Sequence, residues 1–350
     1  MATFEVSPGR WIGGEHPCFI IAEIGQNHQG DIEIAKEMIK MAKDCGADCA
    51  KFQKCQLDQK FNKKALQRPY TSKHSWGATY GEHKAFIEFT EEQFIDLRNY
   101  ANEIGIIFSS SAGDASSIDL LDRIGVPFFK IASVDAGNHQ FIQHAASKGK
   151  PLIISTGMQN MDTVREVYQR MKKINPKFSI LQCTSTYPQP VEDTHLRVIQ
   201  SYKTEFPEVP IGYSGHEAGT AITIAAVTLG AKIVERHVTL DKNWKGNDHM
   251  SSLEPRELKQ LVEDIRTVEK ALGTTEKKIR KSEEPCYLKL GKTVVASHKL
   301  TAGHVISEND LAMKVAEPKG IRTENCERII GRRIKKNIEE DESIIDDDIE

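Results

Sequence analysis

The stretch CFIIAEIG at residues 18–25 is a short apolar run that ends in a carboxylate and a glycine. Seven further runs also end in residues that can bind or transform a substrate, namely CAKFQ (49–53), GIIFSSS (105–111), VPFFKIAS (126–133), PLIISTG (151–157), FSILQCTS (178–185), VPIGYSG (209–215) and AKIVERH (231–237). Nearly every run precedes a stretch with helical periodicity, such as DIEIAKEMIKMAKDCG after the first. Eight such units predict an α/β fold, a (β/α)8 TIM barrel, with its site at the C-terminal ends of the strands.

The length and composition of the chain agree with such a barrel. A barrel needs roughly 250 residues, so a chain of 350 leaves room for a small second domain. A net charge of -3 with 39% hydrophobic residues offers no excess charge for nucleic acid or a membrane surface. The chain has no long apolar run and no signal-peptide pattern at its start. We therefore expect a cytoplasmic protein whose partners are small molecules and other subunits.

The charge pattern divides the chain into three parts. Residues 1–274 contain the repeated units of the predicted barrel, and residues 275–289 belong to a charged stretch, TTEKKIRKSEEP and beyond, that we interpret as a linker. Residues 290–350 have short β-type runs separated by Gly and Pro, which predicts a compact, loop-rich β domain. The acidic end, IEEDESIIDDDIE, is compatible with a disordered tail or with a final ordered turn or strand. The seven cysteines are scattered without a C-x-x-C pair, so we expect reduced thiols.

Lysine and hydroxyl side chains gather at the ends of the predicted strands. Lys51 and Lys130 end the second and fourth strands, which suits a ligand with several negative charges, such as a phosphate or a phosphate with a carboxylate. Hydroxyl groups lie at the same level at Ser109, Ser110, Ser111, Ser133, Ser155, Thr156, Thr184, Ser185 and Ser214. Each of them alone is explained as well by capping of the next helix. Together they favour an anion-binding site.

Two histidines and two glutamates add catalytic chemistry. His216 and His237 end neighbouring strands, and neutral imidazoles so placed suit a divalent metal that keeps positions open for substrate. Histidines at such positions also serve as caps or hydrogen-bonding groups. Glu235 points to the same side of its strand as His237. Glu23 would act as a general acid or base in a positive pocket, or form a salt bridge to Lys51.

The order of the motifs resembles the sialic acid synthase family, a group of phosphoenolpyruvate-condensing (β/α)8 barrels. The matching stretches are IAEIGQNHQGD, AKFQ, PFFKIAS, ISTGM, LQCTSTYP, IGYSGHE and ERHVTLDK. Near the C-terminus, GHVISENDLAMKVAEPKGI resembles the antifreeze-like SAF domain that ends those enzymes. RPYTSKHSWGATYGEHK, at residues 68–84, is similar to the animal branch, whose members use N-acetylmannosamine 6-phosphate. The resemblance leaves open whether the sugar is this compound, mannose 6-phosphate or both.

This resemblance implies a reaction and a set of roles. The enol carbon of phosphoenolpyruvate joins the sugar aldehyde, water attacks the second pyruvate carbon, and phosphate leaves with C–O cleavage. By resemblance, His216 and His237 hold Mn²⁺ or Mg²⁺, which polarises the aldehyde oxygen, and Glu23 directs or deprotonates the water. Phosphoenolpyruvate would be bound by Lys51, Lys130, Ser111, Ser133, Ser155, Ser185 and Ser214. The sugar would be held by Gln53, Tyr187 and Asp248, while Asp135 aligns with an acidic position near the anion site.

The resemblance is weakest where the sugar phosphate and a second subunit are concerned. Many bacterial members carry an arginine at the Pro-Gly turn of the C-terminal domain, which reaches the sugar of a partner subunit in a domain-swapped homodimer. Lys319 stands near that turn here, as a point charge without a bidentate fork, and Ser185 replaces a bacterial asparagine. Cations for the sugar 6-phosphate are expected from the long second loop, at Arg68, Lys73, His74 and Lys84, with Lys242 and Lys245 as competitors.

Three other functions are compatible with parts of this pattern. A Schiff-base aldolase acting on a phosphorylated sugar would use Lys51 or Lys130 as its nucleophile. A metal-dependent hydrolase would need more ligands than two histidines, and its usual H-x-H strand motif is absent from the sequence. Domains like the C-terminal one also occur alone as ice-binding proteins, so a non-catalytic binding role is the third alternative.

Overall fold

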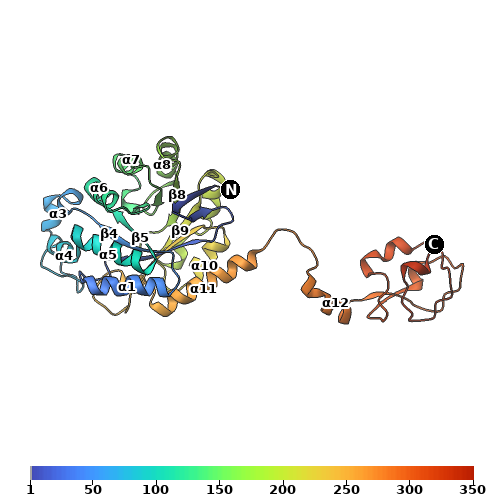
Figure 1. Ribbon diagram of the computed structural model, residues 1–350. Coiled ribbons are helices and arrows are strands. Elements are labelled where there is room, and N and C mark those ends of the chain that lie inside the picture. Colours follow the sequence, from blue (N-terminus) through green and yellow to red (C-terminus); the bar gives the residue numbers. More distant parts are fainter. Residues whose placement is uncertain (1) are drawn as a thin grey trace. The chain divides into compact units, whose positions relative to one another are not determined.

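The computed structural model describes residues 2–350, which divide into two compact units, residues 1–273 and 274–350. In the first unit eight parallel strands form a closed barrel surrounded by helices (Figure 1). The predicted (β/α)8 barrel is thereby confirmed. Because residues 2–350 contain no helix that is both long enough and apolar enough to cross a membrane, the described part of the chain offers no candidate membrane span.

Each predicted apolar run contains one barrel strand. The strands are β3 (Phe19–Gly25), β4 (Cys49–Lys54), β5 (Ile107–Ala112), β6 (Phe129–Ile131), β7 (Leu152–Ser155), β8 (Phe178–Cys183), β9 (Ile211–Gly215) and β10 (Ile233–His237). They are hydrogen-bonded in this order, and β10 pairs with β3 to close the ring. Nearly every strand residue is buried, because a parallel barrel is covered outside by helices and filled inside by side chains.

Helices follow the strands. They are α1 (Ile32–Asp44), α2 (Leu57–Lys60), α3 (Lys63–Gln67), α4 (Tyr80–Ile87), α5 (Glu91–Ile104), α6 (Ala115–Arg123), α7 (His139–Ser147), α8 (Met161–Ile174), α9 (Val198–Glu205), α10 (Ala221–Thr228) and α11 (Pro255–Leu272). In α1 the Asp31 side chain accepts hydrogen bonds from the amides of Glu33 and Ile34, as an N-cap should. The long loop after β4 contains three short helices, α2 to α4, which extend the wall of the barrel mouth.

An N-terminal hairpin that sequence reasoning did not anticipate closes the other end of the barrel. It consists of β1 (Thr3–Ser7) and β2 (Arg10–Gly13), paired antiparallel. Phe4, Val6 and Ile12 form one cluster with the inward-facing residues at the lower end of the barrel, Phe19, Ile21, Cys49, Phe128, Ile153, Leu181 and Ile233. The barrel interior is therefore mainly apolar at the hairpin end, apart from the buried Ser179 beside Ile153, and the charged side chains lie toward the other end.

The C-terminal unit has its own hydrophobic core. Its regular strands are β11 (Thr293–Ala296) and β12 (Leu311–Lys314), paired antiparallel. The core residues are Val294, Ala296, Leu300, Ile306, Ile321, Ile329, Ile334, Ile338 and Ile344. Because Ile338 and Ile344 belong to this core, the acidic end of the chain is ordered, and the tail alternative is wrong. Part of the segment that we interpreted as a linker is a short exposed helix, α12 (Glu284–Leu290), in which proline stands at the first turn.

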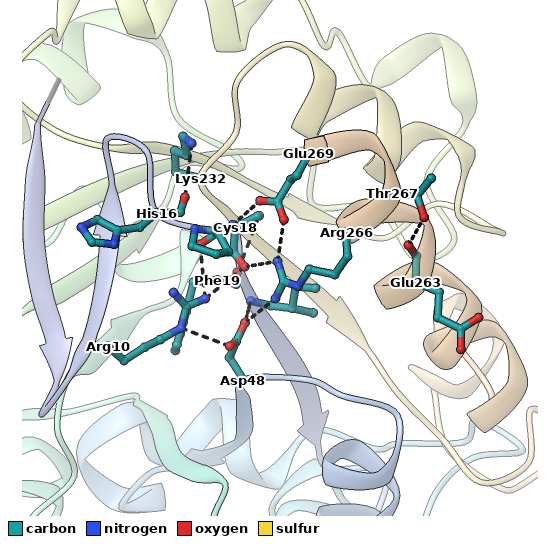
Figure 2. Close-up of polar contacts among 12 residues, drawn as sticks. Arg10, His16, Cys18, Phe19, Asp48, Lys232, Glu263, Arg266, Thr267 and Glu269 are labelled. Atoms are coloured by element: carbon teal, nitrogen blue, oxygen red, sulfur yellow. Dashed lines mark hydrogen bonds and ion pairs between the residues drawn. The ribbon is translucent and has the colours of Figure 1, made fainter. Parts of the chain in front are cut away.

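Ion pairs and hydrogen bonds connect the hairpin, the first strands and the last helix of the barrel (Figure 2). The Asp48 carboxylate lies 3.1 Å from Arg10 Nε and 3.2 Å from Arg266 Nη2, and it also accepts a hydrogen bond from the Ile20 amide at 2.8 Å. Glu269 pairs with Arg266 at 3.0 Å. The half-buried Asp48 thus links β2, β3 and α11, which are distant in the sequence but meet where the barrel closes.

We expect Asp48→Asn to lower the free energy of unfolding of the barrel unit by about 1–3 kcal/mol, because two charge-assisted contacts and a buried amide partner are weakened. All three tryptophans lie in residues 1–273, so their fluorescence during urea unfolding reports this unit alone. Asp44→Asn is the matched control, since Asp44 forms only an exposed pair with Lys40 within one helix, and its effect should be about 0.5 kcal/mol or less. Equal effects of the two changes would contradict the role given to Asp48.

Candidate active site

A cavity of about 420 Å³ opens at the C-terminal ends of the barrel strands. Most of the site residues predicted from the sequence line it, namely Glu23, Lys51, Gln53, Ser111, Lys130, Ser133, Ser155, Ser185, Tyr187, Ser214, His216 and His237. They come from all eight strands or the segments that follow them. The barrel therefore brings together groups that are up to 214 positions apart in the printed sequence, from Glu23 to His237.

Four charged side chains form a buried network at the floor of this cavity. Lys51 Nζ lies 2.5 Å from Glu23 Oε2 and 3.8 Å from Glu235 Oε2, and Lys130 Nζ lies 3.4 Å from Glu235 Oε1. All four residues are at least 93% buried, with Glu235 the most exposed at 7%. The salt bridge between Glu23 and Lys51, considered as an alternative to a catalytic role, is present. It leaves that role open, because the same carboxylate also lines the cavity.

The register of the barrel explains why these charges meet. His237 of β10 is paired with Glu23 of β3, and Glu23 is paired with Lys51 of β4. Because side chains alternate along a strand, Glu235 lies on the same inward face as His237, two residues away. Gly25, with φ of +57°, then turns the chain away from the strand. A Cβ at Gly25 would lie 3.3 Å from both Gln53 Nε2 and His237 Cε1, so the glycine leaves room for these two side chains.

Burial and pairing shift the ionisation of this network in opposite directions. Burial, helped by the negative charge of Glu235, raises the pKa of Glu23 to about 7 in spite of its contact with Lys51. Burial also lowers the pKa of Lys130. For Lys51 burial is outweighed by the two glutamates, which raise its pKa, and for Glu235 it is outweighed by the two lysines, which lower its pKa. Glu23 is thus the group of this network suited to exchange a proton near neutral pH.

Serine hydroxyls form one wall of the cavity, from β6 to β9. Ser155 Oγ is buried and has no hydrogen-bond partner among residues 2–350, so it is available to a ligand. Ser133 Oγ accepts a hydrogen bond of 2.9 Å from the Gly157 amide. A Cβ at Gly157 would lie 2.2 Å from Ser185 Oγ and 2.9 Å from Ser133 Oγ. Glycine is therefore required for these serines to approach one another.

The two histidines lie side by side at the ends of β9 and β10, with ring centroids 5.7 Å apart. His216 Nδ1 is 2.8 Å from the carbonyl oxygen of Thr184, and burial is outweighed by contact with the Cys183 thiol, which raises the pKa of His216. Burial lowers the pKa of His237 to about 4, and its buried Nδ1 has no partner in the described part of the chain. A neutral imidazole with an unused nitrogen, as in His237, suits a divalent metal. Residues 2–350 contain no group of three or more His, Cys, Asp or Glu arranged to hold an ion.

A buried ion pair outside the barrel interior holds the segment that carries His216. Arg236 and Glu217 are fully buried, and Arg236 Nη1 lies 2.9 Å from Glu217 Oε1. Tyr213 OH donates a hydrogen bond of 2.9 Å to the second carboxylate oxygen, and Arg236 Nη1 donates one of 2.8 Å to the carbonyl oxygen of Gly219. Because Glu217 follows His216 directly, this network fixes the chain at the end of β9 and so positions the imidazole.

Five predicted substrate residues lie away from this cavity. Asp248 lines a second cavity of about 350 Å³, which shares Gln26, Gln53, Tyr80, Lys84, Tyr187 and His237 with the first. Arg68 stacks on the Tyr80 ring at 4.0 Å, and Arg68, Lys73 and Asp135 line neither cavity. Lys319 belongs to the other unit, where its ammonium donates a hydrogen bond of 2.7 Å to the carbonyl oxygen of Gly291.

The prediction of the site missed several lining residues, among them Lys60 and Cys183, whose thiol lies 3.5 Å from Ser133 Oγ. Lys84 was predicted, but only as one of several candidate cations. The position of Cys183 at the end of a barrel strand was a usable signal. No such signal existed for Lys60, because its neighbours Lys63 and Lys64 have the same chemistry and only the tertiary structure separates them.

Comparison with known proteins assigns a family to each of the two units. The model of the NeuB family matches residues 38–277, and the model of the SAF domain matches residues 291–350. The chain belongs to the NeuB family. The first match lies almost entirely in the barrel unit and the second lies in the C-terminal unit, because the boundary between the units falls between residues 273 and 274.

Two mammalian relatives in the NeuB family are similar over nearly their whole length. The N-acetylneuraminate-9-phosphate synthase of Mus musculus is 55% identical over 346 residues, which cover 99% of this chain and 96% of that protein. The enzyme of the same name from Homo sapiens is 55% identical over 343 residues, which cover 98% and 96%. The lining lysines, serines and histidines therefore belong to a chain that is similar to sialic acid synthases from end to end.

Solved structures of this family show the same fold. The N-acetylneuraminic acid synthetase from Leptospira borgpetersenii serovar Hardjo-bovis has a TM-score of 0.71 and 33% identity, and the match covers 79% of this chain and 92% of that one. The spore coat polysaccharide biosynthesis protein SpsE from Bacillus subtilis has a TM-score of 0.67 and 31% identity, with 100% and 99% covered. The likeness to the second extends across both units of the chain.

Proposed function

We propose that the chain is an N-acetylneuraminate-9-phosphate synthase, a transferase of sialic acid biosynthesis. It joins phosphoenolpyruvate to N-acetylmannosamine 6-phosphate with one water and releases phosphate. The observation that carries this proposal is the single cavity in which buried lysines and a serine wall lie beside a proton-exchanging glutamate and two neighbouring imidazoles. The 55% identity with the two mammalian synthases supports it independently.

Phosphoenolpyruvate binds along the wall from β6 to β9. Lys130 supplies a positive charge, and Ser155 offers a hydroxyl without a competing partner. Ser133, Ser185 and Ser214 line the same wall, so hydroxyl donors surround one anion-sized volume. Glu235 is 3.4 Å from Lys130, and it keeps the buried ammonium paired until a negatively charged substrate arrives.

The sugar aldehyde and the water are placed at the side of β3 and β4. Gln53 Nε2 donates a hydrogen bond of 3.0 Å to Glu23 Oε1, which fixes the carboxylate orientation. Glu23 then accepts a proton from the water that adds to the second carbon of phosphoenolpyruvate, while the third carbon forms the new bond to the aldehyde carbon and the aldehyde oxygen takes up a proton to become a hydroxyl. Phosphate leaves as the C–O bond breaks, and the added oxygen loses its second proton and becomes the keto oxygen of the product. Gln53, Tyr187 and Asp248 line the adjoining cavity and hold the sugar.

His216 and His237 would hold a divalent metal, Mn²⁺ or Mg²⁺. The metal would polarise the aldehyde oxygen as a Lewis acid. The closeness of the two rings, 5.7 Å between centroids, and the unpartnered Nδ1 of His237 among residues 2–350 support this assignment. The Arg236–Glu217 network holds the backbone beside His216.

A Schiff-base aldolase is the second candidate, because burial lowers the pKa of Lys130 and so favours a neutral amine. Two contacts oppose it. Glu235 lies 3.4 Å from Lys130 and stabilises its charged form, and Lys51, whose pKa is raised, lies 2.5 Å from Glu23. A borohydride treatment that attaches substrate covalently to the chain would favour the aldolase over the synthase.

The assembly is a homodimer in which the C-terminal unit of one subunit covers the barrel mouth of its partner. Apolar side chains exposed around the mouth support a cover, with Val134 59% and Met158 67% exposed. Both residues line the cavity.

The compartment is the cytoplasm. The seven cysteines are free thiols in residues 2–350, as suits a reducing compartment.

Phosphate release from phosphoenolpyruvate should occur with N-acetylmannosamine 6-phosphate or mannose 6-phosphate. EDTA should abolish it, and Mn²⁺ or Mg²⁺ should restore it. The measurement is a colorimetric phosphate assay on a panel of phosphorylated and free sugars, with the product mass determined by mass spectrometry. No release with any aldose would refute the synthase, whereas undiminished release in EDTA would refute only the metal.

The activity should fall at acid pH because Glu23 takes up a proton as the pH drops through its pKa of about 7. With saturating Mn²⁺, kcat/KM should lose about tenfold for each pH unit below 7, as for one essential base. Glu23→Gln, which keeps the side-chain shape, should reduce kcat by roughly a hundredfold or more. An acid limb that moves with the Mn²⁺ concentration would belong to the histidines and contradict the assignment to Glu23.

Removal of residues 281–350 should abolish synthesis, because the mouth loses its cover. Size-exclusion chromatography with light scattering measures the subunit number of the full chain and of the truncated one. Tryptophan fluorescence shows whether the truncated barrel is folded, since all three tryptophans lie in it. A folded, monomeric truncated barrel with full activity would overturn the swapped-cover arrangement.

A further inference from the structure

The main cavity has more positive than negative side chains in its lining. Five lysines and three glutamates line it. The lysines at 51, 54 and 130 each have a glutamate within 4.0 Å. Lys60 and Lys84 have no carboxylate within that distance among residues 2–350. Two ammonium groups in one cavity therefore lack a carboxylate partner, and because Lys60 is exposed and Lys84 is half-buried, both can be reached by an anion that enters from solvent.

Lys84 is held in the cavity wall by its surroundings. It lies on α4, and its ammonium donates a hydrogen bond of 2.6 Å to Gln26 Oε1 and stands 5.5 Å from the centre of the Tyr80 ring. Burial lowers the pKa of Lys84, and the positive charge of Lys60 lowers it further. An anion beside the two ammonium groups would oppose both effects, because a nearby negative charge favours the charged form of lysine.

Lys60 reaches the same cavity from the end of α2. Its side chain lies against Gly113, where a Cβ would come within 2.8 Å of Lys60 Nζ. Gly113 directly follows β5, so the glycine leaves room for the ammonium at the rim of the barrel. Lys60 and Lys84 thus approach from two segments of the long second loop and line the same cavity, close enough for the charge of Lys60 to act on Lys84.

We propose that Lys60 and Lys84 form the subsite for the 6-phosphate of the sugar, with Gln26 orienting the ammonium of Lys84. The inference rests on the proposed synthase function. In the closed ring β4 stands opposite β8, so this subsite lies across the cavity from Ser155 and Ser185, where phosphoenolpyruvate binds. Gln53 of β4 lines both cavities.

The other cations expected from the sequence do not line the main cavity. Arg68 is stacked on Tyr80, and neither it nor Lys73 lines either cavity. Lys242 is paired with Glu257 at 2.6 Å, and Lys245 stands over the Trp76 ring at 4.9 Å. Lys84 is therefore the one cation among those expected from the second loop that lines the main cavity, and Lys60 is its partner.

The test compares Lys60→Met, Lys84→Met and the double variant with the unaltered full chain. The ratio of kcat/KM for N-acetylmannosamine 6-phosphate to that for N-acetylmannosamine should fall about ten- to a hundredfold for each single change, the range of a charge-assisted hydrogen bond. Lys84→Arg should recover most of the ratio, because it keeps the charge. Lys64→Met, a change on exposed α3 outside both cavities, should leave the ratio within about twofold.

Two results would overturn the subsite. One is an equal loss of activity with both sugars, which indicates a role in shape rather than in phosphate binding. The other is a rise in KM for phosphoenolpyruvate with an unchanged sugar ratio, which assigns the two lysines to the other phosphate. Thermal unfolding followed by tryptophan fluorescence identifies any variant that fails to fold. If one single variant fails, the sugar ratios of the other single variant and of Lys84→Arg decide whether the subsite is correct.

Calorimetric binding separates failure of the subsite from failure of the proposed function. Mannose 6-phosphate and mannose are titrated into each full-length protein without phosphoenolpyruvate. The subsite predicts a preference for the phosphorylated sugar that Lys60→Met and Lys84→Met reduce, whether or not the chain catalyses synthesis. Loss of phosphate release in the unaltered chain would refute the function alone, while a preference that survives the double change would refute the subsite alone.

Discussion

Closure of the barrel between β10 and β3 is the constraint on which the site depends. The last strand pairs with the first so that His237 stands beside Glu23, and Glu23 stands beside Lys51. A shift of one residue would turn all of these side chains from the interior to the helix layer, because successive residues on a strand face opposite sides. The Asp48 cluster fastens the hairpin, β3 and α11 where the ring closes, on the side away from the chemistry.

The closed ring also explains how four charged side chains remain buried together. Burial of an unpaired charge is costly, so each lysine of the floor needs a glutamate nearby. Pairing satisfies Lys51 and Glu235, whereas burial dominates for Glu23 and Lys130 and shifts both pKa values toward the neutral form. One network therefore provides a positive surface for an anion and a carboxylate that can take up a proton near pH 7. The Ser155 hydroxyl, which has no partner among residues 2–350, adds a hydrogen-bonding group for that anion.

Some features of the site and the fold could be predicted from the sequence, and others could not. Strand ends such as Glu23, Lys130 and His237 were predictable, because a parallel barrel always places these positions at one mouth. The hairpin was not predictable, since β1 and β2 are short and owe their stability to the barrel floor. Several loop cations were predicted together, but Arg68 and Lys73 line neither cavity. Lys84, which was among them, and Lys60, which was not, line the main cavity.

The sequence by itself determined the barrel, the C-terminal β domain, the family and the strand-end residues, because these follow from periodic apolar runs and from the order of motifs. Tertiary structure alone decided which loop side chains enter the cavity, how Glu23 is ionised, and how the Arg236–Glu217 pair holds the end of β9. Strand positions are set by a two-residue repeat that can be read from the chain. Loop directions and pKa values depend on packing and charge contributed by residues far away in the sequence, which no local pattern records.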